Sequence, residues 1–234
     1  MYSQGKMYNK HNNILYNGCY VNDYKEGFGI SYNYKAGGEF DSYYAGQWKK
    51  NKKNGYGVLY DANHNVIYKG DWQNNKKSGI GHSNDCGGLV QYIGEMKDDM
   101  QHGLGEEYIY DNEKFYLLYD GNFKENSRHE FGKSYTLTTH ELSYEGEYNH
   151  NRKQGEGKQY QTYYSFNHND DLKPQRMLYY SGKFAKGQAA DCGKRYYQNG
   201  RVLQYKITLL AQNPLVRPLE VIYSPYGELY YYKS

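Results

Sequence analysis

The sequence predicts an all-β fold: a single-layer antiparallel array of stacked β-hairpins that is twisted and elongated. One pattern of seventeen residues occurs seven times without a gap between Tyr16 and Tyr196. Within each copy, tyrosine and glycine stand at every second position before and after a polar segment that is typical of a turn. This is the pattern of the two strands of a hairpin. Aromatic residues make up 18% of the chain, with 33 tyrosines, whereas disordered chains contain few aromatics. We therefore expect a folded chain whose core is built from amphipathic rings.

The repeat is most regular in the middle of the chain. The copy at Tyr44 reads YAGQWKKNKKNGYGVLY, and the copy at Tyr68 reads YKGDWQNNKKSGIGHSN. The copies begin at Tyr16, Tyr44, Tyr68, Tyr92, Tyr119, Tyr144 and Tyr180. A repeat of roughly 20–50 residues signals a linear array, in which each unit packs only against its neighbours.

The first strand of each copy carries large rings around a glycine. If the first tyrosine is position zero, positions zero, two and four are tyrosine, glycine and usually an aromatic residue, as in Tyr44, Gly46 and Trp48. Alternate side chains of a strand share one face, so these three point to the same side. We expect a ring from the neighbouring hairpin to lie over the glycine, because close approach is the usual reason for glycine inside a strand.

The turn and the return strand occupy positions seven to sixteen. Position seven is asparagine, aspartate or glycine in every copy, and these residues tolerate the positive φ of a tight turn. Positions eleven and thirteen are glycine in most copies, as in Gly55 and Gly57, and position sixteen is usually tyrosine. Glu130 and Asp191 replace the first of these glycines, and Asn84 replaces one closing tyrosine. We expect those copies to pack less tightly.

The chain divides into three predicted regions around this array. Residues 1–15 form an N-terminal segment, residues 16–196 the array, and residues 197–234 C-terminal hairpins that cap the array or dock. Residues 161–179 are predicted to be an insertion that forms a long hairpin loop between the sixth and seventh copies. In the C-terminal segment, Asn199-Gly200 is a strong hairpin signal.

The pattern Y-x-G-x-aromatic-x₆-G-x-G resembles the MORN repeat. The resemblance covers Tyr16 to Tyr196 in seven copies that share one register. It implies a stacked-hairpin fold and a structural role of the kind that MORN proteins have in radial spokes of cilia and flagella, in other cytoskeletal assemblies and at membrane junctions. Some lipid kinases and lysine methyltransferases carry such repeats beside a catalytic domain, but we expect none here, because the repeats fill this chain.

The large rings of the first strands are the first candidate binding site. A single sheet layer has two faces and no second layer to cover them, so we expect some rings to stay exposed and to contact partners, although simple packing is the alternative. This predicted aromatic face consists of Tyr44, Trp48, Tyr68, Trp72, Tyr92, Tyr119, Phe123, Tyr144 and Tyr148.

Basic residues at the turns are the second candidate site. Successive hairpins are two strands, or roughly 10 Å, apart, so cations at equivalent loop positions would form a ridge along one edge of the array. Its partner would be an acidic protein tail or anionic lipid, and ordinary solubility is the competing explanation. The predicted basic ridge consists of Lys52, Lys53, Lys76, Lys77, Arg128, Arg152 and Lys153.

Composition and motifs point away from several functional classes. The net charge of +3 gives no reason to expect nucleic acid as a partner. The eight histidines lack metal-ligand spacing, and the glycine pairs lie between a turn and a strand, where no phosphate loop occurs. The three cysteines are odd in number and far apart, which favours reduced thiols in an intracellular protein. We expect no catalytic residue, metal, cofactor, secretory signal or transmembrane segment.

The leading interpretation is a non-catalytic scaffold that docks protein partners in a large multi-subunit assembly, and the resemblance implies that this assembly is ciliary or cytoskeletal. About fourteen strands at roughly 4.8 Å would make an array some 65–70 Å long. Two alternatives stay open: a peripheral membrane binder that uses the basic ridge on anionic phospholipid, and an accessory subunit of an enzyme complex.

Overall fold

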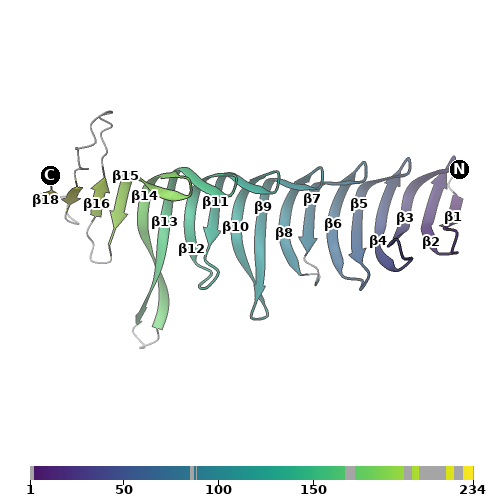
Figure 1. Cartoon of the computed structure of the whole chain (residues 1–234), viewed down its shortest axis with the longest axis horizontal. Coiled ribbons are helices and arrows are strands. Elements are labelled where there is room, and N and C mark those ends of the chain that lie inside the picture. The colour runs from purple at the N-terminus through teal and green to yellow at the C-terminus, as the bar shows by residue number, and fades with distance from the viewer. Residues whose placement is uncertain are drawn as a thin grey trace. The chain divides into compact units, whose positions relative to one another are not determined.

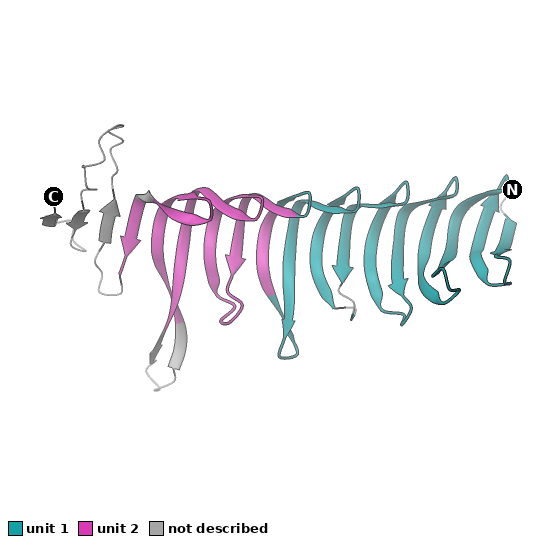
Figure 2. Ribbon diagram, viewed as in Figure 1, with its two compact units in different colours: residues 1–116, 123–126 teal, residues 117–122, 127–234 magenta. Residues whose placement is uncertain are grey.

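The computed structural model describes residues 3–84, 87, 89–166, 172–197, 202–205, 220–223 and 229–233. These residues contain no helix and consist of strands joined by short turns, so the predicted all-β, single-layer antiparallel fold is confirmed (Figure 1). They form two compact units (Figure 2). Unit 1 comprises residues 1–116 and 123–126, and unit 2 comprises residues 117–122 and 127–234. The predicted division at residues 15 and 196 stays a prediction.

Unit 1 is a run of antiparallel strands in which each strand pairs with the next along the chain. Its strands are β1 (Ser3–Tyr8), β2 (Ile14–Val21), β3 (Tyr24–Tyr34), β4 (Phe40–Lys49), β5 (Lys52–Asp61), β6 (Val66–Gln73), β7 (Lys76–Asn84), β8 (Val90–Lys97) and β9 (Met100–Asp111), with both ends of β10 (Lys114–Lys124).

Unit 2 repeats this arrangement with the central part of β10 and eight further strands. These are β11 (Ser127–Tyr135), β12 (Leu142–Asn149), β13 (Arg152–Phe166), β14 (Leu172–Ala185), β15 (Gln188–Tyr196), β16 (Val202–Tyr205), β17 (Glu220–Tyr223) and β18 (Leu229–Lys233). β15 pairs with β16, whereas the predicted Asn199-Gly200 turn between them lies outside the described residues, so the C-terminal hairpin stays a prediction.

A two-residue turn closes each hairpin at positions six and seven. Both residues have positive φ, as in Lys50 at 47° and Asn51 at 66°, which is the geometry of a type I′ turn. The prediction of turn chemistry at position seven is therefore confirmed. The residues that follow the turn, from position eight onward, already belong to the return strand, as Lys52 does at the start of β5.

A bulge on the return strand accounts for the glycine at position eleven. The register skips between Gly46 and Trp48, and Gly55 opposite this gap has a φ of 88°. A side chain here would also clash, because a Cβ on Gly55 would lie 2.0 Å from the Oε1 atom of Gln47. In the fifth copy Glu130 adopts the same conformation at 52°, which costs a non-glycine residue about 1–2 kcal/mol.

The predicted loop at residues 161–179 is wrong over most of its length. Residues 161–166 belong to β13 and residues 172–178 to β14, and the two strands pair from Gln161↔Met177 to Phe166↔Leu172 (Figure 1). The insertion therefore lengthens the hairpin with paired strand. Its tyrosine-rich sequence YYSF has high β-propensity, which explains the difference.

Candidate functional site: the two faces of the strands

We call the side of the strands that carries positions zero, two and four the ring face. The Tyr44 ring lies over the glycine pair of its own hairpin, since a Cβ on Gly46 or Gly57 would come within 2.4 Å of that ring or its hydroxyl. The Tyr44 hydroxyl donates a 3.0 Å hydrogen bond to the carbonyl of Gln47. We expected a ring from the neighbouring hairpin over the glycines, and this was wrong: the tyrosine of the same copy covers them.

The same tyrosine geometry recurs in every copy. The position-zero hydroxyl donates to the carbonyl of position three at 2.8–3.1 Å in all seven hairpins, from Tyr16 to Tyr180. Burial raises the pKa of these phenols where a shift is resolved, for example at Tyr44 and Tyr144. A neutral, hydrogen-bonded phenol is the form that suits a core residue.

The ring at position four joins one hairpin to the one before it. Trp72 packs edge-on against Tyr68 of its own copy at 5.3 Å and against Tyr44 of the preceding copy at 5.1 Å. Its indole Nε1 donates a 3.2 Å hydrogen bond to the carbonyl of Gly57. In unit 2, Phe184 lies in the same way between Tyr144 and Tyr180. Each such aromatic pair stabilises the packing by about 0.5–1.5 kcal/mol beyond its buried area.

The predicted exposure of the aromatic face is wrong for all nine residues. Tyr44 and Tyr68 have no exposed surface, and Trp48 and Trp72 are 6% and 5% exposed. The remaining members are equally buried: Tyr92, Tyr119, Phe123, Tyr144 and Tyr148. Rings, glycine backbone and the neighbouring hairpin seal one another without a second layer. These side chains are core, and their role in partner binding stays a prediction that their burial does not support.

Sequence reasoning also left several members of this core unnamed. Tyr16, Met96, Tyr180 and Phe184 occupy the same positions and are buried to the same degree. Met96 was missed because it is not aromatic, although its place at position four identifies it. The copies that depart from the pattern keep a fully buried tyrosine at Tyr68, Tyr119 and Tyr180, and their expected looser packing stays a prediction.

The structure separates the predicted basic ridge into two sets, and the expectation of one exposed ridge in the loops is wrong. The position-nine cations turn back over the ring face. The Lys53 Nζ atom lies 4.8 Å from the ring centroids of both Tyr44 and Trp72, and burial lowers the pKa of Lys53. The other members of this set are Lys77, Arg128 and Lys153, each 4.6–4.8 Å from its tyrosine.

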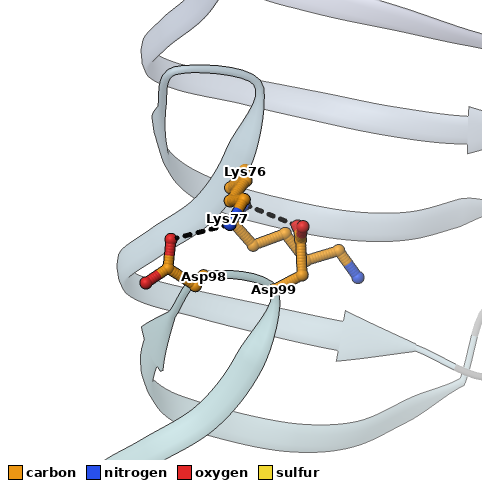
Figure 3. A network of polar contacts seen from close by, with 4 residues as sticks. All are labelled: Lys76, Lys77, Asp98 and Asp99. Carbon is orange, nitrogen blue, oxygen red and sulfur yellow. Dashed lines mark hydrogen bonds and ion pairs between the residues drawn. The ribbon is translucent and has the colours of Figure 1, made fainter.

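The position-eight cations Lys52, Lys76 and Arg152 are exposed. Lys76 pairs with Asp98 on the next hairpin at 3.1 Å (Figure 3). An exposed pair of this kind contributes about 0–1 kcal/mol. The cations of the ridge that project into solvent are therefore fewer than expected, and an acidic side chain shares the hairpin tips with them.

The turn residue at position seven fastens each hairpin to the one before it, a role that sequence reasoning missed. Asn75 Oδ1 accepts a 2.8 Å hydrogen bond from the backbone N–H of Lys53, and the Asn75 N–H donates back to the Lys53 carbonyl at 3.0 Å. Asp99 makes the same two bonds to Lys77, and Figure 3 shows the one that its carboxylate accepts. In the last copy Gly187 keeps the backbone bond alone to Lys153. The preference for asparagine or aspartate over glycine was the available signal.

The opposite side of the strands carries exposed residues in unit 1. Position twelve, between the two glycines, is 51–61% exposed in the first four copies. Position three of the next copy lies beside it, as the register pairs Phe28↔Gln47, Tyr56↔Asp71 and Ile80↔Glu95 show. We call this set the outward row of unit 1; from β3 to β9 it contains Phe28, Gln47, Tyr56, Asp71, Ile80, Glu95 and Leu104.

The equivalent positions of unit 2 are mostly polar. Phe131 in β11 is 54% exposed and lies opposite Glu147 of β12. Glu156 in β13 lies opposite Lys183 of β14, and both are exposed. Asn122 in β10 completes this set, and its Nδ2 donates to the Phe131 carbonyl at 3.2 Å. Of the two copies of unit 2 whose position twelve is described, one carries an exposed apolar side chain, Phe131, and the other carries Glu156, whereas all four copies of unit 1 carry an apolar one.

Among the described residues, no group of three or more His, Cys, Asp or Glu side chains is arranged to hold a metal ion. Within the same ranges, no helix of the length and apolarity needed to span a bilayer occurs.

Comparison with known families agrees with the hairpin geometry. The family model described as MORN repeat matches six segments: residues 16–32, 44–66, 68–83, 92–113, 119–135 and 144–161. The seventh copy at Tyr180 is not among them, although its tyrosine, glycine pair and Phe184 have the same geometry. No curated protein sequence matches the chain.

Proposed function

Because the chain is a MORN-repeat protein, and these repeats bind proteins or membrane lipids rather than catalyse reactions, we propose that it is a non-catalytic docking protein that holds protein partners on the outward row of unit 1. The observation that carries the proposal is the exposure of Phe28, Tyr56, Ile80 and Leu104 at one equivalent position. Exposed apolar side chains that gather in one patch mark an interaction surface, whereas single exposed apolar side chains are ordinary on a protein surface.

The ring face supports this choice of surface by elimination. Its side chains are sealed within the sheet, so a partner would have to unpack the core to reach them. The outward row needs no rearrangement, because its side chains stand on paired strands whose backbone hydrogen bonds are already made. A site of this kind keeps the entropic cost of binding low.

Membrane binding through the basic ridge is the second candidate, and the structure favours it less. Lys53 and Lys77 lie over rings, and Lys76 is paired with Asp98. The ciliary or cytoskeletal assembly and the accessory role beside an enzyme stay predictions drawn from the resemblance.

Affinity capture from native material, followed by mass spectrometry, tests the docking function. The double variant Tyr56→Ser, Ile80→Ser should reduce capture of the specific partners at least about tenfold, because central interface anchors commonly contribute about 2 kcal/mol or more. The matched control Lys52→Glu, Lys76→Glu should leave capture unchanged. A second assay measures salt-sensitive sedimentation of the protein with acidic vesicles. If Lys52→Glu, Lys76→Glu abolishes both capture and sedimentation while Tyr56→Ser, Ile80→Ser changes neither, the basic ridge is the site and the proposal is wrong.

A further inference from the structure

The outward row of unit 1 alternates apolar and polar side chains across successive strands. Phe28, Tyr56, Ile80 and Leu104 stand on β3, β5, β7 and β9. Exposed Gln47, Asp71 and Glu95 stand between them on β4, β6 and β8. The row therefore carries an apolar side chain on every second strand. From β5 to β9, a carboxylate lies between successive apolar side chains.

The carboxylates are held in the row by the backbone. Asp71 Oδ2 accepts a 3.2 Å hydrogen bond from the N–H of Ile80, and Glu95 Oε1 accepts a 3.0 Å bond from the N–H of Leu104. Gln47 makes the equivalent 2.9 Å bond to the N–H of Tyr56, so an amide serves this structural purpose as well as an acid does. The negative charges at Asp71 and Glu95 are thus not needed for the fold.

The spacing of the row selects the backbone conformation of a ligand that lies along it. Neighbouring strands are roughly 4.8 Å apart, so apolar groups recur every 9.6 Å or so with a polar group midway. In an α-helix, residues three to four apart share a face and are separated by about 5.2 Å, and heptad positions by about 10.5 Å. In an extended strand, side chains on one face are about 6.6 Å apart, which matches neither spacing of the row. In a polyproline helix they are about 9.3 Å apart, but no side chain lies on that face midway to meet the polar group.

The charges select the chemistry of that ligand. A partner covering the row desolvates Asp71 and Glu95, so it must bring cations to them. A second copy of this chain would set the carboxylates of one row against a row that carries no cation, and the row itself offers an anionic bilayer no cation either. A helix with lysine or arginine between its apolar positions supplies both groups on one face.

We propose that the outward row of unit 1 binds an amphipathic α-helix of a partner protein, with an apolar residue at every seventh position and a basic residue three or four positions after it. This inference rests on the proposed docking function and specifies its ligand. The apolar positions pack on Tyr56, Ile80 and Leu104, and the basic positions pair with Asp71 and Glu95.

A synthetic helical peptide of about four heptads tests the inference with the full chain, by fluorescence anisotropy. The peptide has leucine at every seventh position, lysine three positions later, and alanine and glutamine elsewhere; a second peptide has glutamate in place of each lysine. The lysine peptide should bind at least about tenfold more tightly than the glutamate peptide. Asp71→Asn with Glu95→Gln should remove this preference, while Glu147→Gln with Glu156→Gln in unit 2 should preserve it.

Equal binding of the two peptides, or an unchanged preference in the Asp71→Asn, Glu95→Gln variant, would overturn the helix assignment. Because the amides keep the backbone hydrogen bonds, that variant is expected to fold normally, and its melting temperature provides the check. If neither peptide binds but Tyr56→Ser, Ile80→Ser still reduces partner capture, the helix is excluded and the docking function stands. If capture is also independent of the row, both proposals fail.

Discussion

In copies one to four, which lie in unit 1, the residue between the two glycines is Phe28, Tyr56, Ile80 or Leu104, whereas in unit 2 it is Phe131 in copy five and Glu156 in copy six. The ring faces of both units are built alike, with a buried tyrosine at position zero in every copy and, from the second copy onward, a buried residue at position four. The repeat thus fixes one side of each strand for folding and leaves the other side free to vary. A difference between the outward sides therefore reports on partners rather than on stability.

The largest expected effect that separates the units is alkaline unfolding. Burial raises the pKa of six tyrosines in unit 1, whereas in unit 2 a pKa raised by burial is resolved for Tyr144 and Tyr160. The six in unit 1 are Tyr16, Tyr20, Tyr43, Tyr44, Tyr68 and Tyr92. A raised folded-state pKa means that the stabilisation is complete below the ordinary value near 10 and is lost as the pH rises beyond it. The lowered pKa values of Lys25, Lys53 and Lys77 act in the opposite direction, but only up to about 10.5.

Urea midpoints at pH 9, 10.5 and 11.5 measure this dependence. Since both tryptophans lie in unit 1, their fluorescence follows that unit, and its midpoint should fall steeply above pH 10.5. A midpoint that stays constant to pH 11.5 would show that the phenols ionise freely and are not core.

Truncation of a position-four ring should cost nearly as much in either unit. Trp72→Ala and Phe184→Ala each remove a large buried side chain that joins two hairpins, so each should lower the free energy of unfolding by about 3–5 kcal/mol. Chemical denaturation followed by circular dichroism measures the loss. A cost below about 1 kcal/mol in either unit would mean that its ring face is not a core.

Loss of the position-seven hydrogen bonds between hairpins should have an intermediate effect on stability. In unit 2 the opposite change, which adds such a bond, can be made. Asn75→Ala removes the hydrogen bond to Lys53 and places alanine at a φ of 73°, so it should cost about 2 kcal/mol. Asn75→Gly keeps the conformation and should cost about 1 kcal/mol. Gly187→Asn should add the missing bond to the Lys153 N–H and stabilise unit 2 by up to about 1 kcal/mol. Equal stability of the alanine and glycine variants would refute the strain contribution.

The smallest expected change comes from the bulge of copy five. Glu130→Gly relieves the positive φ of 52°, but glycine also gains entropy in the unfolded chain, so the net stabilisation should be below about 1 kcal/mol. The matched change Gly79→Ala in unit 1 should destabilise, because its Cβ would lie 2.5 Å from the Asp71 Oδ2 atom. Thermal melting of the two variants checks both signs, and destabilisation by Glu130→Gly would contradict the assignment of strain.

The sequence was sufficient for the hairpins, their turns and their stacking, because period-two alternation and Asn, Asp or Gly at position seven encode them locally. It was insufficient for the site. A strand pattern shows which side chains share a face, but not that Tyr44 folds back over its own glycines and closes that face. Lys52 and Lys53 look equivalent in the sequence, yet they lie on opposite sides of β5. Their alternation relative to Gly57 was the signal that would have separated them.

Fluorescence quenching of the two tryptophans by acrylamide tests the central claim most directly, namely that the ring face is core and the outward side is open. The chain contains two tryptophans, Trp48 and Trp72, both on the ring face. In the isolated native protein their emission should be blue-shifted and weakly quenched. A Trp48→Phe, Trp72→Phe, Tyr56→Trp variant carries its single indole in the outward row, and this indole should be quenched strongly. Strong quenching of native Trp48 and Trp72, or protection of the indole at position 56, would contradict the account.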